Sequence, residues 1–212
     1  MSDSNRPTVE TLRELVGSVD IYLFDQILKG RFAPGCRILD AGCGGGRNLV
    51  FFLQAGYPVY GVDRQPGLVE SARRLAARLA PELPRENFQV EPVEKLSFDD
   101  ASFDAVLASA LLHFARDTRH FKSMVTELWR VLAPGGFFFA RLASTIGIED
   151  RVEPIRDRRF HLPDGTDRFL VDEAMLTDYA SALGAELAEP LKTTNVQNLR
   201  AMTTWCLSKR AG

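Results

Sequence analysis

The stretch Ile38-Leu39-Asp40-Ala41-Gly42-Cys43-Gly44-Gly45-Gly46-Arg47-Asn48 decides how this 212-residue chain folds. A short apolar run ends at Ala41, four glycines follow within five positions, and a helical pattern begins at Asn48. In an open α/β sheet, ligands bind in the crevice beyond the carboxyl end of such a strand. Glycines let the backbone turn sharply and let a ligand approach it closely, and the free N–H groups of the next helix favour an anion. The stretch therefore predicts a ligand-binding loop.

The loop does not follow either of two familiar phosphate-binding patterns. The dinucleotide pattern G-x-G-x-x-G, counted from Gly42, requires a third glycine where Arg47 stands, and a P-loop requires a Lys followed by Ser or Thr. The loop instead follows D-x-G-x-G-x-G, from Asp40 to Gly46. Because a carboxylate at the end of the strand would repel a pyrophosphate, Asp40 suits a ligand with a positive amine, or it orders the loop by accepting backbone N–H bonds.

Outward from this loop, short apolar runs alternate with longer amphipathic ones. Apolar and β-branched clusters predict strands over 37–41, 58–62, 88–91, 103–108 and 137–142. Apolar residues at helical spacing predict helices over 18–29, 48–54, 66–79, 119–132 and 172–183. This alternation predicts an α/β fold in which helices cover both faces of a parallel sheet.

The end of the chain predicts a different kind of pairing. Strands are expected over 186–191 and 201–208, with only a short loop between them. Since a parallel return needs a crossover of about a dozen residues or more, these two strands are expected to form an antiparallel hairpin. The sequence has no internal repeat and no linker long enough to divide it, so we expect one domain over 1–212.

Composition excludes several classes of protein. Apolar residues make up 45% and charged residues 25% of the chain, as in ordinary globular domains. The net charge of −2 gives no overall attraction to nucleic acid or an anionic membrane, and no apolar stretch approaches the roughly 20 residues of a membrane-spanning helix. The polar N-terminus does not resemble a signal peptide. No cluster has metal-ligand spacing, and Cys36, Cys43 and Cys206 form no C-x-x-C pair. We expect a cytoplasmic protein without a metal, nucleic-acid or membrane partner.

A second acidic residue follows the next predicted strand. Asp63 comes directly after 58–62, where a carboxylate can accept both hydroxyls of a ribose. Asp63 also stands shortly before the helix that begins at Pro66, so it is a candidate for the N-cap of that helix. The two roles are compatible, and the sequence leaves both open.

Four sequence blocks appear in a fixed order along the chain. They are Asp40 to Gly46, then Asp63 with Pro66 and Leu68, then Phe103-Asp104-Ala105-Val106, and then Leu132-Ala133-Pro134-Gly135-Gly136. In these blocks the chain resembles the class I S-adenosylmethionine-dependent methyltransferases, most of all the small-molecule type. The ending Gly46-Arg47-Asn48 is similar to the tellurite-resistance-type members. The resemblance implies a three-layer Rossmann-like fold with a seven-stranded, mostly parallel sheet whose last strand is antiparallel.

The resemblance also implies S-adenosyl-L-methionine as cofactor and assigns positions to it. The implied cofactor-binding residues are Asp40, Gly42, Cys43, Gly44, Arg47, Asp63, Arg64, Leu68, Val93, Glu94, Ser109 and Ala110. The backbone of 42–44 would follow the methionine part, with Asp40 near its amino group, and Ser109 and Ala110 would line the same end. Asp63 would hold the ribose. Leu68 would pack on the adenine, and the backbone N–H of Val93 would meet the adenine edge.

Two of these assignments have alternatives. The family often has an acidic residue before the adenine contact, where this chain has Pro92. Glu94 would take over the adenine amine, or it belongs to an irregular exit from the strand. Arg47 would pair with the carboxylate of the cofactor, or it is a solvated arginine in the first turn of the helix.

The resemblance predicts methyl transfer to a small-molecule acceptor by direct in-line displacement. His113 follows the strand nearest the methyl group and would be a general base or a substrate contact; alternatively, it helps to cap the next helix. Tyr22, Arg156 and Arg159 are candidate substrate residues. We expect an N-terminal helical lid over 1–36, a cofactor-binding core over 37–142, a substrate cap over 143–171, and a helix with the closing hairpin over 172–212.

Two other functions compete with this one. The same fold can bind S-adenosylmethionine without transferring a methyl group, and then acts as a regulator or scaffold. A nicotinamide oxidoreductase is disfavoured because Arg47 replaces the third glycine of the dinucleotide pattern.

Overall fold

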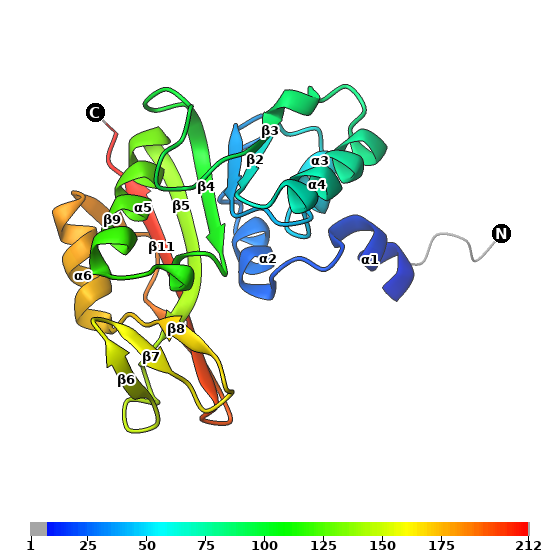
Figure 1. The fold of residues 1–212 in the computed structure, drawn as a ribbon. Helices are drawn as coiled ribbons and strands as arrows, with labels where there is room; N and C mark the ends of the chain where they lie inside the picture. The colour runs from blue at the N-terminus through cyan, green and yellow to red at the C-terminus, as the bar shows by residue number, and fades with distance from the viewer. Residues whose placement is uncertain (1–7, 212) are drawn as a thin grey trace.

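The computed structural model describes residues 8–211, which fold around one large sheet (Figure 1). Its strand order is β10-β11-β5-β4-β1-β2-β3, and β9 also pairs with β11. Neighbours from β3 to β5 run parallel, whereas β11 is antiparallel to β5. The strands are β1 (Ile38–Ala41), β2 (Val59–Asp63), β3 (Phe88–Val90), β4 (Phe103–Ser109), β5 (Leu132–Ser144), β9 (Ala185–Leu187), β10 (Lys192–Val196) and β11 (Arg200–Lys209).

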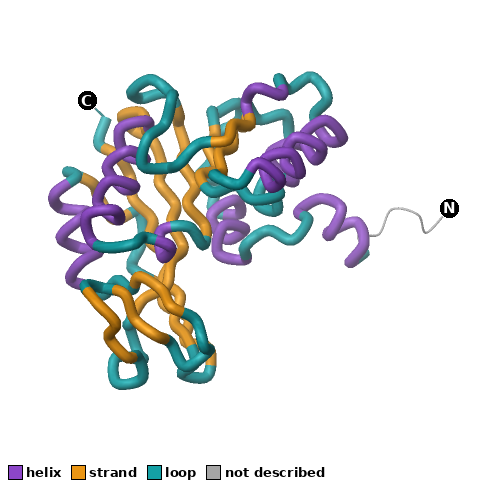
Figure 2. The backbone as a smooth tube through the Cα atoms, in the orientation of Figure 1, coloured by secondary structure: helices purple, strands orange, loops and turns teal. Residues whose placement is uncertain are grey.

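Helices cover both faces of this sheet (Figure 2). One apolar cluster joins the sheet to α5 and α6, and a second joins it to α2, α3 and α4. Strand β1 is buried along its whole length, as expected for a parallel strand covered on both sides. The helices are α1 (Val9–Val16), α2 (Ile21–Leu28), α3 (Val50–Gln54), α4 (Pro66–Leu79), α5 (Thr118–Val131) and α6 (Glu173–Ala182), with short 3₁₀ turns η1 (Arg85–Asn87) and η2 (Leu112–Phe114).

The expected three-layer α/β fold is therefore confirmed. If β9 and β10 are taken as one interrupted strand beside β11, the sheet has the expected seven strands with an antiparallel last one. Of the helices within residues 8–211, none is both long enough and apolar enough to cross a membrane.

The expected hairpin is present, but the bounds of its first strand were wrong. The segment 186–191 does not form one strand; β9 ends at Leu187 and β10 begins at Lys192. Pro190 lies in the gap and has no N–H to donate to the ladder. Both pieces pair with β11, so the hairpin extends further along the chain than the apolar pattern indicates.

The sequence predicts one N-terminal helix, over 18–29, but the structure has two: α2 corresponds to the predicted helix, and α1 precedes it. The side chain of Asp20 accepts the N–H of Tyr22 at 3.0 Å and so begins α2 at Ile21. Helix α1 ends before Gly17, which has a positive φ of 61° and passes so close to Val50 that a Cβ would lie 2.8 Å from its Cγ2. Residues 1–7 of the expected lid lie outside the described residues.

The expected cap segment contains a small sheet that the sequence pattern did not predict. Strands β6 (Glu153–Arg156), β7 (Arg159–His161) and β8 (Asp167–Phe169) pair antiparallel in that order. Figure 1 shows this sheet beyond the carboxyl end of β5. Ser144 at the end of β5 forms a bridge with Val171, so both ends of the segment meet at the main sheet.

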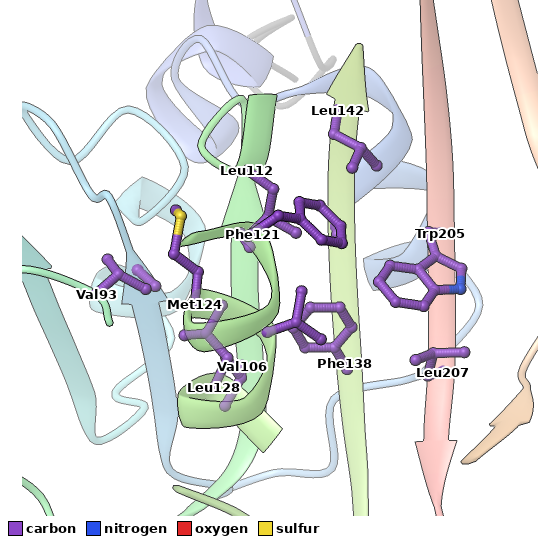
Figure 3. Close-up of a cluster of buried hydrophobic side chains, with 14 of the residues drawn as sticks. Val93, Val106, Leu112, Phe121, Met124, Leu128, Phe138, Leu142, Trp205 and Leu207 are labelled. Carbon is purple, nitrogen blue, oxygen red and sulfur yellow. The ribbon is translucent and has the colours of Figure 1, made fainter. Parts of the chain in front are cut away.

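Phe138 occupies the centre of the core between the sheet and α5 (Figure 3). Its ring lies 5.7 Å from that of Trp205 on β11 and 6.5 Å from that of Trp129 on α5, both edge to face. These contacts join the parallel part of the sheet to the antiparallel last strand.

We expect Phe138→Ala to lower the free energy of unfolding by about 3–5 kcal/mol, because it removes a buried ring and leaves a cavity. Urea denaturation measures this change. Leu187→Ala is the matched control, since Leu187 is 45% exposed and its truncation should change stability by less than about 0.5 kcal/mol. Equal losses in the two variants would contradict this view of the core.

Candidate functional site

The glycine loop after β1 is held against the end of β2. The N–H groups of Gly42 and Cys43 both donate to the carbonyl oxygen of Val62, at 2.8 and 2.9 Å. Gly42 has a positive φ of 69°, and a Cβ there would lie 2.7 Å from Cδ1 of Leu111. Because both the conformation and the space exclude a side chain, only glycine fits this turn.

Asp63 connects the loop to the segment that precedes α4. One carboxylate oxygen accepts the N–H of Gly44 at 3.1 Å, and the other accepts the N–H of Gln65 at 2.9 Å. The N-cap position of α4 is Gln65, so Asp63 does not cap that helix directly. Each oxygen of the carboxylate keeps acceptor capacity for a further donor, which the hydroxyls of a ribose could supply.

Asp40 is buried directly behind the loop, with 1% of its surface exposed. Its Oδ2 is buried and has no hydrogen-bond partner among the described residues. Burial raises the pKa of Asp40 to about 7; Arg47 opposes this shift and Asp63 adds to it. The loop N–H groups of 42–44 bond to Val62 and Asp63, so the alternative in which Asp40 orders the loop receives no support from these bonds. An unpaired buried oxygen is costly, and a cationic donor would satisfy it.

A cavity of about 270 Å³ opens beside the loop. Seven of the predicted cofactor residues line it, namely Gly42, Asp63, Arg64, Leu68, Val93, Glu94 and Ala110. Five other predicted residues do not line it, namely Asp40, Cys43, Gly44, Arg47 and Ser109. Its wall also contains residues that sequence reasoning did not assign to the site, namely Gln65, Glu91, Pro92, Leu111, Phe114, Arg116, His120 and Met124.

Glu94 is on the loop after β3, with two basic residues near its carboxylate. Its Oε1 lies 3.1 Å from Nε2 of His120 and 3.8 Å from Nη2 of Arg116. Nδ1 of His120 accepts the N–H of Arg116 at 3.1 Å, so the proton of the neutral ring lies on Nε2, which is buried and makes no hydrogen bond to Glu94 despite the short separation. The sequence alone could not assign His120 to the site, because no motif surrounds it; its proximity to Glu94 appears only in the folded structure.

A second polar cluster lies at the end of β4 and joins the N-terminal segment to β5. Asp20 is its centre: its Oδ2 accepts from Ser109 at 3.3 Å and from Arg141 at 3.1 Å, and lies 3.8 Å from Arg47. The N–H of Asp20 donates to Asn48 at 3.0 Å. The side chain of Arg47 is 51% exposed, and its positive charge acts on two buried carboxylates, Asp20 and Asp40.

Tyr22, a predicted substrate residue, belongs to the same cluster. The guanidinium carbon of Arg141 lies 4.5 Å from the centre of the Tyr22 ring, and the Tyr22 hydroxyl bonds to Thr194 on β10. The ring therefore packs beside the end of β5.

His113, the candidate catalytic residue, is in η2 and is buried. Its Nδ1 accepts the N–H of Ala143 at 3.3 Å, which puts the proton of the neutral ring on Nε2. Burial, followed by the positive charges of Arg168 and Arg141, lowers the pKa of His113 to about 4. An imidazole with so low a pKa is a weak general base near neutral pH, and its Nδ1 already accepts from Ala143, so both observations favour the substrate-contact alternative. Capping of α5 is done by Asp117, which accepts from His120 at 2.7 Å.

The two predicted substrate arginines of the cap segment, Arg156 and Arg159, are cross-strand partners in the pairing of β6 with β7. Arg159 on β7 donates to the carbonyl oxygen of Ala115 at 3.4 Å, next to η2. Arg156 on β6 is exposed. Arg168 on β8, which was not singled out, lies 5.0 Å from the centre of the Phe114 ring in the cavity wall. Within residues 8–211 there is no group of three side chains suited to bind a metal ion.

Comparison with known proteins agrees with this geometry. Residues 39–140 match the family model described as methyltransferase domain. The uncharacterized methyltransferase YodH of Bacillus subtilis is 37% identical over 117 residues, 55% of this chain and 44% of that protein. The ubiquinone biosynthesis O-methyltransferase of Methylocella silvestris is 36% identical over 140 residues, 64% of this chain and 52% of that protein. The chain thus spans about half the length of the curated relatives it matches.

A solved structure extends the similarity to the whole fold. The S-adenosylmethionine-dependent methyltransferase of Methanosarcina mazei superposes with a TM-score of 0.72 at 23% identity, covering 88% of this chain and 98% of that one. Residues 39–140 therefore form a methyltransferase domain, in a chain whose fold is that of the class I S-adenosylmethionine-dependent methyltransferases.

The buried carboxyl of Asp40 predicts a pH-dependent stability of the ligand-free protein. Because its pKa is raised to about 7 in the folded state, the neutral carboxyl stabilises the fold fully below about pH 4, and this contribution is lost as the pH rises through about 7. Asp40→Asn removes the titration. We expect the variant to gain at least about 1 kcal/mol relative to the parent protein between about pH 4 and about pH 8 in urea denaturation.

Asp150→Asn controls for the general effect of losing a carboxylate, because Asp150 has 86% of its side chain exposed. Its stability difference from the parent protein should be the same at both pH values. A pH-independent difference for Asp40→Asn would contradict the assigned shift.

Proposed function

We propose that this chain transfers a methyl group from S-adenosylmethionine to a small-molecule acceptor by direct in-line displacement. The observation that carries the proposal is the pair of carboxylates at neighbouring strand ends. Asp40 presents a buried oxygen that lacks a donor, and Asp63 lines the adjoining cavity with acceptor capacity to spare. An ammonium group and a ribose diol, carried by one ligand, match these two needs.

The residues present fit the cofactor along its length. Asp40 would face the ammonium group, and Arg47 would face the carboxylate, with Ser109 and the backbone of 42–44 along the methionine part. Asp63 would accept from the ribose, beside Arg64 and Ala110. Support for this order comes from the glycine loop, whose backbone is exposed to the cavity at Gly42 and bonded to β2 behind it.

The adenine would occupy the apolar end of the cavity. Leu68 and Met124 supply apolar surface there, and the backbone N–H of Val93 would meet the ring edge. Glu94 would accept from the exocyclic amine, as the resemblance to the family implies. His120 and Arg116 would orient its carboxylate.

When bound, the cofactor supplies a sulfonium methyl group that is already activated. The task of the protein is then to align a nucleophile behind the methyl carbon and to exclude water, and orientation of this kind can supply roughly 7–11 kcal/mol. Helix α2 and the cap sheet β6–β8 would enclose the acceptor, since Tyr22 packs on Arg141 of β5 and Arg159 donates to Ala115 next to η2. The exposed position of Arg156 gives no support to its predicted contact.

We further place the enzyme in the cytoplasm and give it no nucleic-acid partner. The support is the near-neutral net charge of −2 and the presence of three free cysteines, Cys36, Cys43 and Cys206.

Asp63→Asn should weaken binding of S-adenosylhomocysteine more than tenfold, because it removes the charge that strengthens the hydrogen bonds to the ribose. Isothermal titration calorimetry measures the affinity, with Asp150→Asn as control. The parent protein should bind S-adenosylmethionine and S-adenosylhomocysteine but not NAD. Binding of NAD without either sulfur ligand would overturn the proposed function.

Methyl transfer is separated from simple binding by release of S-adenosylhomocysteine. A panel of thiols, amines, phenols and carboxylates is incubated with the protein and S-adenosylmethionine, and acceptor-dependent product release is measured. Release with any acceptor supports the enzyme; binding of the cofactor without release across the panel favours a regulator or scaffold.

A further inference from the structure

Phe114 contacts both His113 and an arginine of the cap sheet: its ring centre lies 4.6 Å from that of the His113 ring and 5.0 Å from the guanidinium carbon of Arg168. Arg141 comes from β5 and Arg168 from β8, and the positive charges of both act on the imidazole ring. Strand β8 packs against η2, the turn that carries His113, and Ala143 of β5 donates its N–H to that ring. The main sheet and the cap sheet thus meet at this histidine.

The charge of Arg141 is already compensated. Its Nη1 lies 3.1 Å from Oδ2 of Asp20, and its guanidinium lies over the ring of Tyr22. Arg141 therefore fixes α2 against β5, and its buried Nε is left without a hydrogen-bond partner among the described residues.

The charge of Arg168 is not compensated in the same way. Its Nη1 donates to the carbonyl oxygen of Asp167 at 2.9 Å, and its guanidinium carbon lies 5.0 Å from the centre of the Phe114 ring. Among residues 8–211, no carboxylate oxygen lies within 4.0 Å of its nitrogens. In contrast, the nearby Arg158 pairs with Asp172 at 2.6 Å. Arg168 does not line the cavity itself, but its guanidinium contacts Phe114, which does.

His113 adds a hydrogen-bond donor to this charge. Because its Nδ1 accepts from Ala143, the ring carries its proton on Nε2. His113 and Arg168 therefore offer only donors. A pair of this composition favours a ligand that supplies acceptors and negative charge, and charge-assisted hydrogen bonds are the strong ones.

On this geometry, and resting on the proposed function, we propose that the methyl acceptor is a small organic acid whose carboxylate is held by Arg168 and the Nε2–H of His113. Phe114 and Tyr22 lie next to the two arginines and provide aromatic surface for the body of the acceptor. Arg168 is the residue that determines specificity, and it comes from the cap sheet rather than from the cofactor-binding core.

The test uses matched acids and amides, which differ in charge but little in shape. Benzoate, phenylacetate, cinnamate and hexanoate are each compared with the corresponding amide. Binding to the complex of the protein with S-adenosylhomocysteine is measured by calorimetry, and product release is measured with S-adenosylmethionine. We expect at least one acid to bind ten times more tightly than its amide.

Three variants assign the preference to Arg168. Arg168→Gln should lower the affinity for that acid about tenfold and leave the affinities for its amide and for S-adenosylhomocysteine unchanged. Arg168→Lys, which retains the charge, should keep part of the preference. Arg151→Gln is the control, because Arg151 belongs to the same segment and has 58% of its side chain exposed.

Two outcomes overturn the inference while the proposed function stands. In the first, S-adenosylhomocysteine binds but no acid binds more tightly than its amide. In the second, Arg168→Gln leaves the preference for the acid intact. Failure of S-adenosylhomocysteine to bind the parent protein is a different result, since it overturns the proposed function and this inference with it.

Discussion

The bonds between the end of β2 and the glycine loop are the constraint on which the site depends. Val62 accepts two loop N–H groups through its carbonyl oxygen, and Asp63 accepts a third through its side chain. Because these N–H groups of the loop already donate to Val62 and Asp63, they do not bond to Asp40, whose Oδ2 is buried without a hydrogen-bond partner. The same register that pairs β1 with β2 therefore creates an oxygen that needs a donor from outside the protein.

Local signals accounted for most of the fold. The parallel strands and their helices follow from apolar periodicity and from turn residues, because burial on both faces requires continuous apolar runs. The small sheet β6–β8 was missed because its strands are mostly exposed, and β6 is exposed throughout. Helix α1 was missed although its reciprocal cap between Thr8 and Thr11 is a local feature, since none of its side chains is buried.

The candidate site shows the same difference between residues marked by local sequence and residues placed by tertiary contacts. Residues that follow a strand or belong to the glycine loop, such as Asp63 and Gly42, could be assigned from their position in the sequence. Residues brought to the site by tertiary contact could not: 89 positions separate Asp20 from Ser109, and Arg168 reaches Phe114 from the cap sheet. The position of the proton on the His113 ring could not be predicted from sequence either, because it depends on the contact of Nδ1 with Ala143.

The position of β11 has a consequence for how the protein is made. This strand lies between β5 and β10 and carries Trp205 and Leu207, so residues 200–209 complete one of the two apolar clusters. A nascent chain can arrange the earlier strands while it is still attached to the ribosome, but an edge of β5 stays unpaired until these residues emerge. Exposed strand edges favour aggregation, so we expect the chain to be most prone to aggregate before β11 pairs with β5.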